Sequence, residues 1–474
     1  MSRIVVIGGG VGGLVAAVLL SWSGHSVTLL EAGRSLGGKS RRIELDGQQL
    51  DTGPSLFTFP SVWEEFLARL EQMSSKFPTS VKDVAGLELE RLPSVGRYYY
   101  HDDNCSLPVQ PGHAWYPAWK RFAEIHGGLG APITRLLTTA PTAPAAAPSL
   151  ARLGMLYGRH LTTRSYLDSL TWLPDGLREI IAIHTLNAGV GPSQTPALYA
   201  SMPAVMAHDG VWVPRGGVYE LIRALERLAV RGDVDVRTDE EVYEVASGAV
   251  TTSKGVYTAD VVVSGIDEQK LEALLGRPVP TPVQNRSCSA IGLYAVLKRP
   301  LPEGTAGHSV VLPDDPSSLY ASLRAHREPD QTMAFVNYYP ADGHESNTKN
   351  TLALLLTSPS NGSSYRLDSD FVRRELSRVS NLLGLGTAVE DYIESHLILD
   401  PAYFSMAGSG GGALYGRIRP LWMSGPFHQP RAHSYRRPWL WRVGASVHPG
   451  GGLPAVIGGA MMTVDRLNKS SRTI

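Results

Sequence analysis

Glycines within residues 8–13 and one later acidic residue, Glu31, have the types and spacing of a nucleotide site. Gly8, Gly10 and Gly13 form a G-x-G-x-x-G pattern: the first allows a tight turn, the second admits a pyrophosphate close to the backbone, and the third lets a helix pack on a strand. Glu31 lies 18 residues past Gly13, where its carboxylate can accept hydrogen bonds from both hydroxyls of a ribose and would repel a 2′-phosphate. The pattern predicts a dinucleotide, FAD or NAD, and disfavours NADP.

The surrounding residues predict the elements that position these glycines. Residues 3–7 are a β-branched apolar run, residues 14–22 repeat apolar positions at helical spacing, and residues 26–30 are a second apolar run. The order strand, turn, helix, strand places phosphates at the free amides of a helix N-terminus. Two uncharged stretches, 4–24 and 443–464, are long enough for a membrane span. Glycines in the first, and prolines and glycines in the second, destabilise a continuous helix, so we predict no span in either.

Charge and cysteine content narrow the class of protein. The 474 residues contain 44 basic and 44 acidic side chains, so no net field attracts nucleic acid. Cys105 and Cys288 match no metal or redox spacing and fit a reducing compartment. The histidines have no metal-ligand spacing, and no G-x-S-x-G motif is present. We therefore expect a cytoplasmic protein with no metal site, no nucleic-acid partner and no serine hydrolase chemistry.

The segment EAGRSLGGKSRRIELDGQQLDTGPSLFT, residues 31–58, resembles the start of the FAD-dependent phytoene desaturase family, within the wider group of amine oxidases and protoporphyrinogen oxidases. The resemblance implies that Gly37, Gly38 and Lys39 lie along the flavin diphosphate, with lysine where arginine is commoner. It also implies that Gly53 and Pro54 lie beside the flavin ring.

Three later segments extend the resemblance over the whole chain. VWVPRGGVYELIRAL, residues 211–225, resembles the element that re-enters the flavin domain, and residues 237–245 and 259–265 resemble a strand pair whose backbone at Val242 contacts adenine. LWRVGASVHPGGGLPAVIGGAMMT, residues 440–463, resembles the C-terminal signature of carotenoid desaturases. The complete candidate cofactor site is Gly8, Gly10, Gly12, Gly13, Glu31, Gly37, Gly38, Lys39, Gly53, Pro54, Val242, Gly444, His448, Pro454, Ala455 and Val456.

The C-terminal signature also has a physical interpretation of its own. The glycines at 450–452 allow a flat ligand close to the backbone, and Pro454 suits the first turn of a helix over residues 455–462. The N-terminus of this helix would face the pyrimidine edge of the flavin, where negative charge develops on reduction. For His448, a role near the flavin and a purely structural role stay equally open.

These observations predict an α/β protein with a discontinuous Rossmann-type FAD-binding domain. Apolar runs between residues 287 and 358 predict a substrate domain with a mixed or antiparallel sheet. Residues 105–209 have a helical pattern interrupted by prolines. The predicted boundaries are 1–75, 210–280 and 438–474 for the FAD domain, 76–104 and 281–437 for the substrate domain, and 105–209 for a helical subdomain.

A stretch after His113 combines apolar and basic side chains. It fits either contact with lipid headgroups or packing inside the helical subdomain, and both interpretations stay open. The residues concerned are Trp115, Tyr116, Trp119, Phe122, Leu136 and Leu137, with Lys120, Arg121 and Arg135.

The resemblance implies an FAD-dependent desaturase that introduces a C=C bond into a long apolar polyene, at the surface of a membrane. The segment SLFT after Pro54 favours the hydroxycarotenoid 3,4-desaturase branch over the phytoene-acting branch. A carotene cis-trans isomerase using reduced FAD and a flavin-free lipid carrier of the same fold are the alternatives, and a soluble amine oxidase is a further one. The sequence identifies no proton acceptor, and it leaves oxygen and quinone open as electron acceptors.

Overall fold

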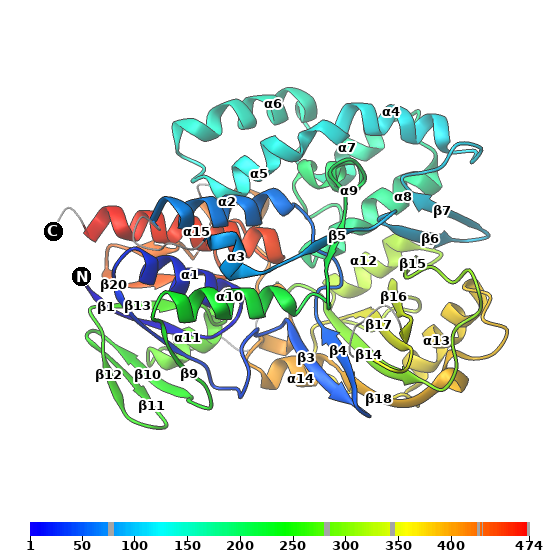
Figure 1. Ribbon diagram of the computed structural model, residues 1–474. Coiled ribbons are helices and arrows are strands. Elements are labelled where there is room, and N and C mark those ends of the chain that lie inside the picture. Colours follow the sequence, from blue (N-terminus) through cyan, green and yellow to red (C-terminus); the bar gives the residue numbers. More distant parts are fainter. Residues whose placement is uncertain (74–79, 279–284, 342–346, 424–426, 429, 472–474) are drawn as a thin grey trace.

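The computed structural model describes residues 1–73, 80–278, 285–341, 347–423, 427–428 and 430–471. Figure 1 shows two sheets side by side, with a layer of helices across the top of both. The predicted domain boundaries at 75/76 and 280/281 lie outside the described residues.

The first sheet is mostly parallel and draws strands from both ends of the chain. Its order is β19-β20-β13-β1-β2-β9, and every neighbouring pair is parallel except β19 with β20. The predicted strands 3–7 and 26–30 are confirmed as neighbouring parallel members of this sheet, β1 and β2. The strands are β1 (Arg3–Ile7), β2 (Ser26–Leu30), β9 (Asp235–Arg237), β13 (Val261–Ser264), β19 (His433–Ser434) and β20 (Arg437–Arg442). β19 lies within residues 281–437, which the sequence assigns to the substrate domain, yet it pairs into this sheet.

Helices and a small sheet cover the two faces of this parallel sheet. The helix α1 is buried at 11 of its 12 residues because it packs between α10 and α15. Its uniformly apolar sequence is therefore that of a core helix. No helix in the described part of the chain has the length and apolarity to span a bilayer. The elements are α1 (Val11–Trp22), α2 (Pro60–Met73), α3 (Val81–Ala85), α10 (Glu220–Arg231), α11 (Glu268–Leu274) and α15 (Leu453–Ser471), with β10 (Val242–Ala246), β11 (Ala249–Thr252) and β12 (Val256–Thr258).

The second sheet is the one predicted from the apolar runs between residues 287 and 358. Its order is β18-β14-β17-β16-β15-β6-β7, antiparallel except for β15 with β6. All nine residues of β14 are buried, since both faces of this strand are covered. The strands are β6 (Gly96–Tyr100), β7 (Asp103–Leu107), β14 (Ser289–Leu297), β15 (His308–Val311), β16 (Ala334–Tyr339), β17 (Thr351–Ser358) and β18 (Ile393–Leu399). The helices α12 (Pro316–Arg324), α13 (Asp370–Leu382) and α14 (Pro401–Met406) accompany this sheet.

A hairpin and a pair of strands from distant parts of the chain lie between the sheets. The strands β3 (Arg41–Leu45) and β4 (Gln48–Thr52) pair with each other and pack Ile43, Leu45 and Leu50 against the second sheet. The strands β5 (Leu89–Arg91) and β8 (Trp212–Pro214) form the other pair. The chain therefore crosses between the two sheets directly beside the glycines of the candidate site.

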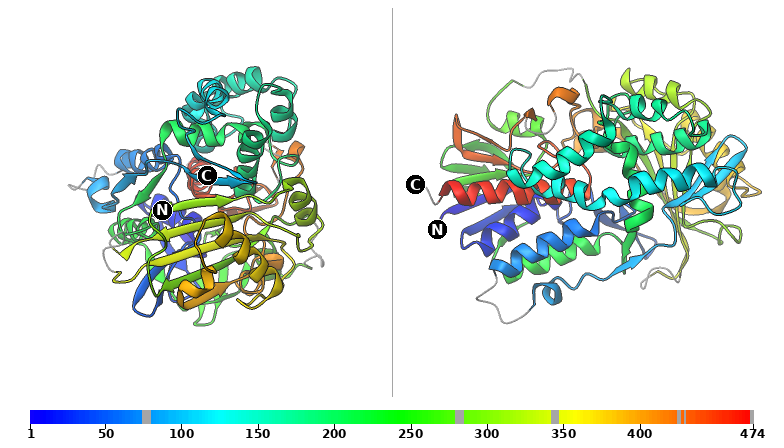
Figure 2. Two further views of the ribbon diagram at one scale, coloured as in Figure 1. Left: turned by 90° about the vertical axis from the view of Figure 1, so that its right-hand side faces the viewer. Right: turned by 90° about the horizontal axis from the view of Figure 1, so that it is seen from above.

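The helical pattern predicted for residues 105–209 is confirmed from α4 (Tyr116–His126) onward, but residues 105–107 are part of β7 and pair with β6 in the second sheet. Besides α4, the helical layer contains α5 (Gly130–Thr138), α6 (Ala147–Tyr157), α7 (Thr163–Ser169), α8 (Asp175–Ile183) and α9 (Met202–Asp209). Trp119 and Phe122 are buried in the core, so for these two aromatic residues packing replaces the lipid contact considered above. Figure 2 shows this layer from above, with no other element over it.

Candidate cofactor site

The glycine turn after β1 has the geometry that its spacing predicts. A methyl group at Gly13 would lie 1.9 Å from the carbonyl oxygen of Gly8, so only glycine allows this approach of helix and strand. Gly8 has a φ of 93°, the left-handed region that favours glycine. The helix α1 begins after Gly10, with no side chain capping its first amides and no acidic residue in its first turn. Its positive end is therefore available to an anionic ligand.

Glu31 lies beside this turn, as predicted. Its two carboxylate oxygens accept hydrogen bonds from the backbone amides of Gly9 and Gly33, each at 2.8 Å. The backbone carbonyl of Glu31 accepts a hydrogen bond from the amide of Glu240 at 2.9 Å, which brings the start of β10 and Val242 to the same edge of the sheet. These bonds fix the carboxylate at the carboxyl end of β2, where an adenosine ribose would be held.

The two ends of the chain meet at Gly12. A methyl group there would lie 3.0 Å from the Cα atom of Gly444 and 3.1 Å from Cγ1 of Val456. The helix α15 packs along α1 and, like α1, has no acidic residue in its first turn. It extends from Leu453 to Ser471 and is longer than the predicted 455–462. Two helix N-termini with uncompensated dipoles therefore lie close together, as the C-terminal signature predicts.

The turns at Gly37–Gly38 and at Gly53 pack closely against neighbouring backbone and extend the glycine surface of the candidate site. A methyl group at Gly38 would lie 3.0 Å from the Cα atom of Gly10, and one at Gly53 would lie 2.3 Å from the carbonyl oxygen of Lys39. The amide of Gly53 donates a hydrogen bond to the hydroxyl of Tyr294, on β14, at 3.2 Å. Glycines from separate segments thus form one continuous backbone surface, which suits a ligand that needs close backbone approach.

The ammonium of Lys39 lies on the loop before Tyr415. It donates hydrogen bonds to the carbonyl oxygens of Leu414, at 2.6 Å, and Ala413, at 3.3 Å. Surrounding protein lowers the pKa of Lys39 to about 8, an effect that the nearby carboxylate of Asp267 partly opposes, yet much of the side-chain surface remains exposed. Lys39 is therefore surrounded by protein and keeps an accessible surface. Contact with the diphosphate stays a prediction for Lys39.

Tyr415 has the same combination of properties. Burial raises the pKa of its phenol, and part of its surface is nevertheless accessible. A methyl group at Gly189 would lie 2.7 Å from its ring, and one at Gly451 would lie 2.4 Å from it. Tyr415 therefore lies between the helical layer and the C-terminal signature, next to the carbonyl of Leu414 that Lys39 contacts.

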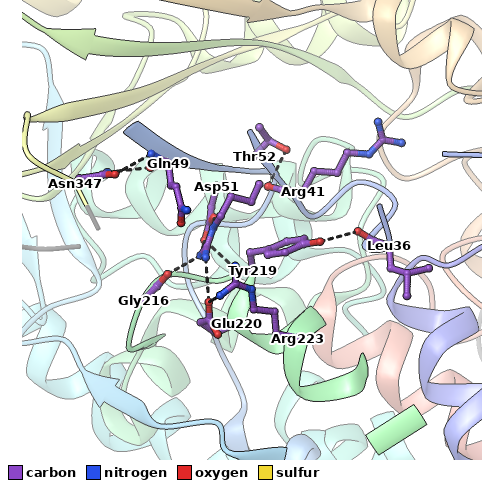
Figure 3. A network of polar contacts seen from close by, with 11 residues as sticks. Leu36, Arg41, Gln49, Asp51, Thr52, Gly216, Tyr219, Glu220, Arg223 and Asn347 are labelled. Carbon is purple, nitrogen blue, oxygen red and sulfur yellow. Dashed lines mark hydrogen bonds and ion pairs between the residues drawn. The ribbon is translucent and has the colours of Figure 1, made fainter. Parts of the chain in front are cut away.

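Arg42, near the start of the β3–β4 hairpin, joins Asp51, Gly216 and Glu220, three residues that Figure 3 labels. Arg42 donates to both carboxylate oxygens of Asp51, at 2.6 and 3.1 Å, to Glu220 at 3.0 Å, and to the carbonyl oxygen of Gly216 at 2.5 Å. Asp51 also accepts a hydrogen bond from the amide of Tyr219. The guanidinium is largely buried and joins the hairpin before Gly53 to the start of α10. Sequence reasoning missed this network, because the partners are as much as 178 positions apart.

His448 is packed over the first turns of α15. A methyl group at Gly459 would lie 3.0 Å from its carbonyl oxygen. Burial, with a smaller effect of His428, lowers the pKa of His448 to about 4, so the imidazole is neutral at physiological pH. Among the described residues its Nε2 atom has no hydrogen-bond partner. The role of His448 toward a flavin stays a prediction.

The arrangement fits a flavin dinucleotide. Uncapped helix amides, a fixed carboxylate at the end of β2 and glycine surfaces from both chain ends are the features that a diphosphate, a ribose and a flat ring require. The family comparison agrees with this fit: residues 11–402 match the family described as flavin containing amine oxidoreductase. The chain belongs to that family and is an FAD-dependent oxidoreductase.

The curated relatives cover nearly the whole chain. A 4,4'-diapolycopene oxygenase from Methylomonas sp is 27% identical, with 98% of both chains covered. A zeta-carotene-forming phytoene desaturase from Myxococcus xanthus is 26% identical, with 98% of this chain and 93% of the relative covered. A 4,4'-diapophytoene desaturase from Staphylococcus aureus is 22% identical, with 98% and 99% covered.

Solved structures confirm the fold. A triple mutant of putrescine oxidase has a TM-score of 0.66 at 14% identity and covers 100% of this chain and 99% of its own. A cyclohexylamine oxidase from Brevibacterium oxydans has a TM-score of 0.62 at 15% identity, with 99% of both chains covered. At these identities the similarity establishes the architecture only.

Proposed function

We propose that this protein is an FAD-dependent desaturase of a carotenoid-type polyene. The single observation that carries the proposal is similarity over 98% of the chain to enzymes named for carotenoid desaturation and oxygenation. The glycine surface where Gly12 meets Gly444 and Val456 supports it, because it joins the dinucleotide turn to the carotenoid-type signature. FAD supplies the hydride acceptor when it is bound.

Two side chains near Gly53 and Tyr415, those of Tyr294 and Cys288, are uncharged, which suits an apolar substrate. Burial raises the pKa of Tyr294 to about 12 and that of Cys288 to about 12, so both remain protonated at neutral pH. The chain would position the polyene between the second sheet and the helical layer and exclude water from it. One hydrogen leaves the substrate as a hydride and the neighbouring one as a proton, which a base or water accepts.

Expression beside candidate carotenoids, followed by chromatography with mass and absorption spectra, tests the proposal. A desaturase removes two hydrogen atoms and lengthens the chromophore by one double bond per turnover. An unchanged mass with altered geometry would establish the isomerase instead, and added oxygen would establish the activity named for the Methylomonas relative. The named relatives do not support the isomerase or the flavin-free carrier.

We also propose peripheral association with a membrane, because the substrate class is insoluble in water. Flavin reoxidation then requires an acceptor that reaches this site, either oxygen or a quinone. The hydroxycarotenoid 3,4-desaturase branch remains the proposed specificity. Turnover of hydroxylated and unsubstituted carotenoids by the same preparation separates this branch from the phytoene-acting branch, and preference for the unsubstituted substrate would contradict it.

A further inference from the structure

The helix α6 differs from the rest of the helical layer in its outward face. Residues Ser149, Leu153 and Tyr157 form its buried stripe. On the opposite side Pro148, Ala151 and Met155, at spacings of three and four, are all exposed and apolar. Met155 is 80% exposed, Leu150 on the flank is 46% exposed, and Leu161 just beyond the helix is 74% exposed. A soluble surface helix normally carries charged or polar residues on this side.

The stretch of sequence that contains α6 carries charged side chains of positive sign only. Between Glu124 and Asp168 the chain contains no acidic residue but four arginines. Arg152 and Arg159 are exposed and flank the apolar stripe. Arg152 donates a hydrogen bond to the carbonyl oxygen of Gly128, which fixes it at the end of α4. An apolar helix face beside cations fits the interface of an anionic bilayer.

The position of α6 connects this face to the cofactor site. Figure 1 places α6 at the outer edge of the molecule. The helix packs on α5, and α5 packs on α15. A methyl group at Gly458 of α15 would lie 2.0 Å from the carbonyl oxygen of Leu137, at the end of α5. A single helix therefore separates the exposed face from the helix whose N-terminus meets Gly12.

We propose that the outward face of α6, defined by Pro148, Leu150, Ala151, Met155 and Leu161, is the surface that docks on an anionic lipid bilayer. The proposal rests on the proposed function, since it gives the polyene a route from lipid to enzyme. A second copy of the chain fits this face less well, because a twofold contact would bring together two faces whose charge has the same positive sign.

Vesicle binding by the FAD-loaded protein tests the proposal. We expect binding to phosphatidylcholine vesicles containing phosphatidylglycerol, with weaker binding to pure phosphatidylcholine. The double variant Leu150→Glu/Met155→Glu should bind at least about tenfold more weakly, because carboxylates then face the headgroups. The matched control Val230→Glu/Val256→Glu changes residues that are 72% and 65% exposed elsewhere, and it should bind like the unmodified chain. Arg152→Gln/Arg159→Gln should lower only the dependence on anionic lipid.

Several results would overturn this assignment. Unchanged vesicle binding by Leu150→Glu/Met155→Glu would exclude the face, as would loss of binding confined to a Trp422→Glu variant, whose tryptophan is 69% exposed on another segment. Dissociation of a dimer by the α6 substitutions would assign the face to a second copy. Turnover in detergent micelles should be the same for the α6 variant and the unmodified chain. A protein that binds vesicles but desaturates no carotenoid in micelles would contradict the proposed function and leave the docking surface intact.

Discussion

At the scale of single residues, the site depends on a carboxylate that is bonded through both oxygens and on a glycine that has no room for a side chain. Glu31 uses both carboxylate oxygens on backbone amides, and Gly12 lies where two segments from opposite chain ends touch. Glu31 was predicted from its spacing to the glycine pattern, because a phosphate turn has a fixed local geometry, and Gly12 was predicted as a glycine within that turn. Arg42 and Tyr415 could not be predicted in this way, since their roles come from partners that are distant in sequence and follow no period.

Exchange of Glu31 tests the ribose contact. Glu31→Gln keeps the size of the side chain and removes its charge, so one of the two backbone amides loses its acceptor and a charge-assisted bond to ribose is lost. We expect the affinity for FAD to fall by roughly ten- to a hundredfold, the equivalent of about 1.5–3 kcal/mol. Flavin fluorescence titration of the apoprotein measures this constant.

The control for that titration is Glu64→Gln, an exposed carboxylate on α2. It should bind FAD like the unmodified chain. Equal affinity of the Glu31 variant and this control would contradict the assignment of Glu31 to the dinucleotide.

His126 makes the stability of the helical layer sensitive to acid. Burial lowers its pKa to about 3, and its ring atoms bond to Ser201 and Tyr166. The folded-state pKa of His126 lies below the unfolded value of about 6.5. The stability that neutral His126 contributes is therefore complete above about pH 6.5 and is lost progressively as the pH falls below it. The loss should approach about 1.4 kcal/mol per pH unit. Thermal unfolding midpoints between pH 7.5 and 4.5 record it.

The variant His126→Gln should unfold at a lower temperature at pH 7.5 and lose less on acidification. His101→Gln replaces an exposed imidazole and should keep the full dependence on pH. The same slope in all three proteins would show that His126 does not cause the acid sensitivity.

At the scale of helices and strands, regular patterns predicted most of the architecture. The runs that became β14, β15, β16 and β17 were recognisable because a buried strand is uniformly apolar. The packing of the β3–β4 hairpin against the second sheet was not recognisable, since its alternating pattern does not specify which sheet it covers. The sequence likewise left open whether Trp119 and Phe122 face lipid or the core, because an apolar pattern does not specify what it packs against.

The contact between α1 and the C-terminal segment can be tested with helical glycines. Gly12→Ala places a methyl group against Gly444 and Val456, so we expect a loss of about 1–3 kcal/mol in stability together with weaker FAD binding. Gly154→Ala, in α6, meets no atom within 4 Å and should stabilise the protein by about 0.5–1 kcal/mol. Chemical unfolding measures both variants. A Gly12→Ala protein with unchanged flavin content would contradict the close approach.

At the scale of the whole molecule, the flavin site joins segments that are far apart in the chain. The parallel sheet contains strands from residues 3–30, 235–264 and 433–442. Such a discontinuous domain was expected from the resemblance and not from composition, since no local pattern indicates which distant strands become neighbours. The domain boundaries themselves remain a prediction.

Binding of FAD should therefore stabilise the protein as a unit. At a free concentration of 100 times the dissociation constant, a ligand that binds only the folded state adds about 2.7 kcal/mol. We expect a higher unfolding temperature in both the near-ultraviolet and far-ultraviolet signals, because the cofactor connects both chain ends. A thermal scan insensitive to added FAD would contradict the site as described and would favour a flavin-free carrier.

The strand β20 and the helix α15 are synthesised long after β1 and α1, yet they complete the sheet and the site that those two elements begin. During translation the glycine turn emerges first but lacks the segment at Gly444 and Val456 that closes it. A nascent chain that lacks this segment therefore presents only the N-terminal part of the cofactor site. Capture of the flavin consequently waits until α15 has emerged from the ribosome, and the apolar surface of α1 requires protection until then.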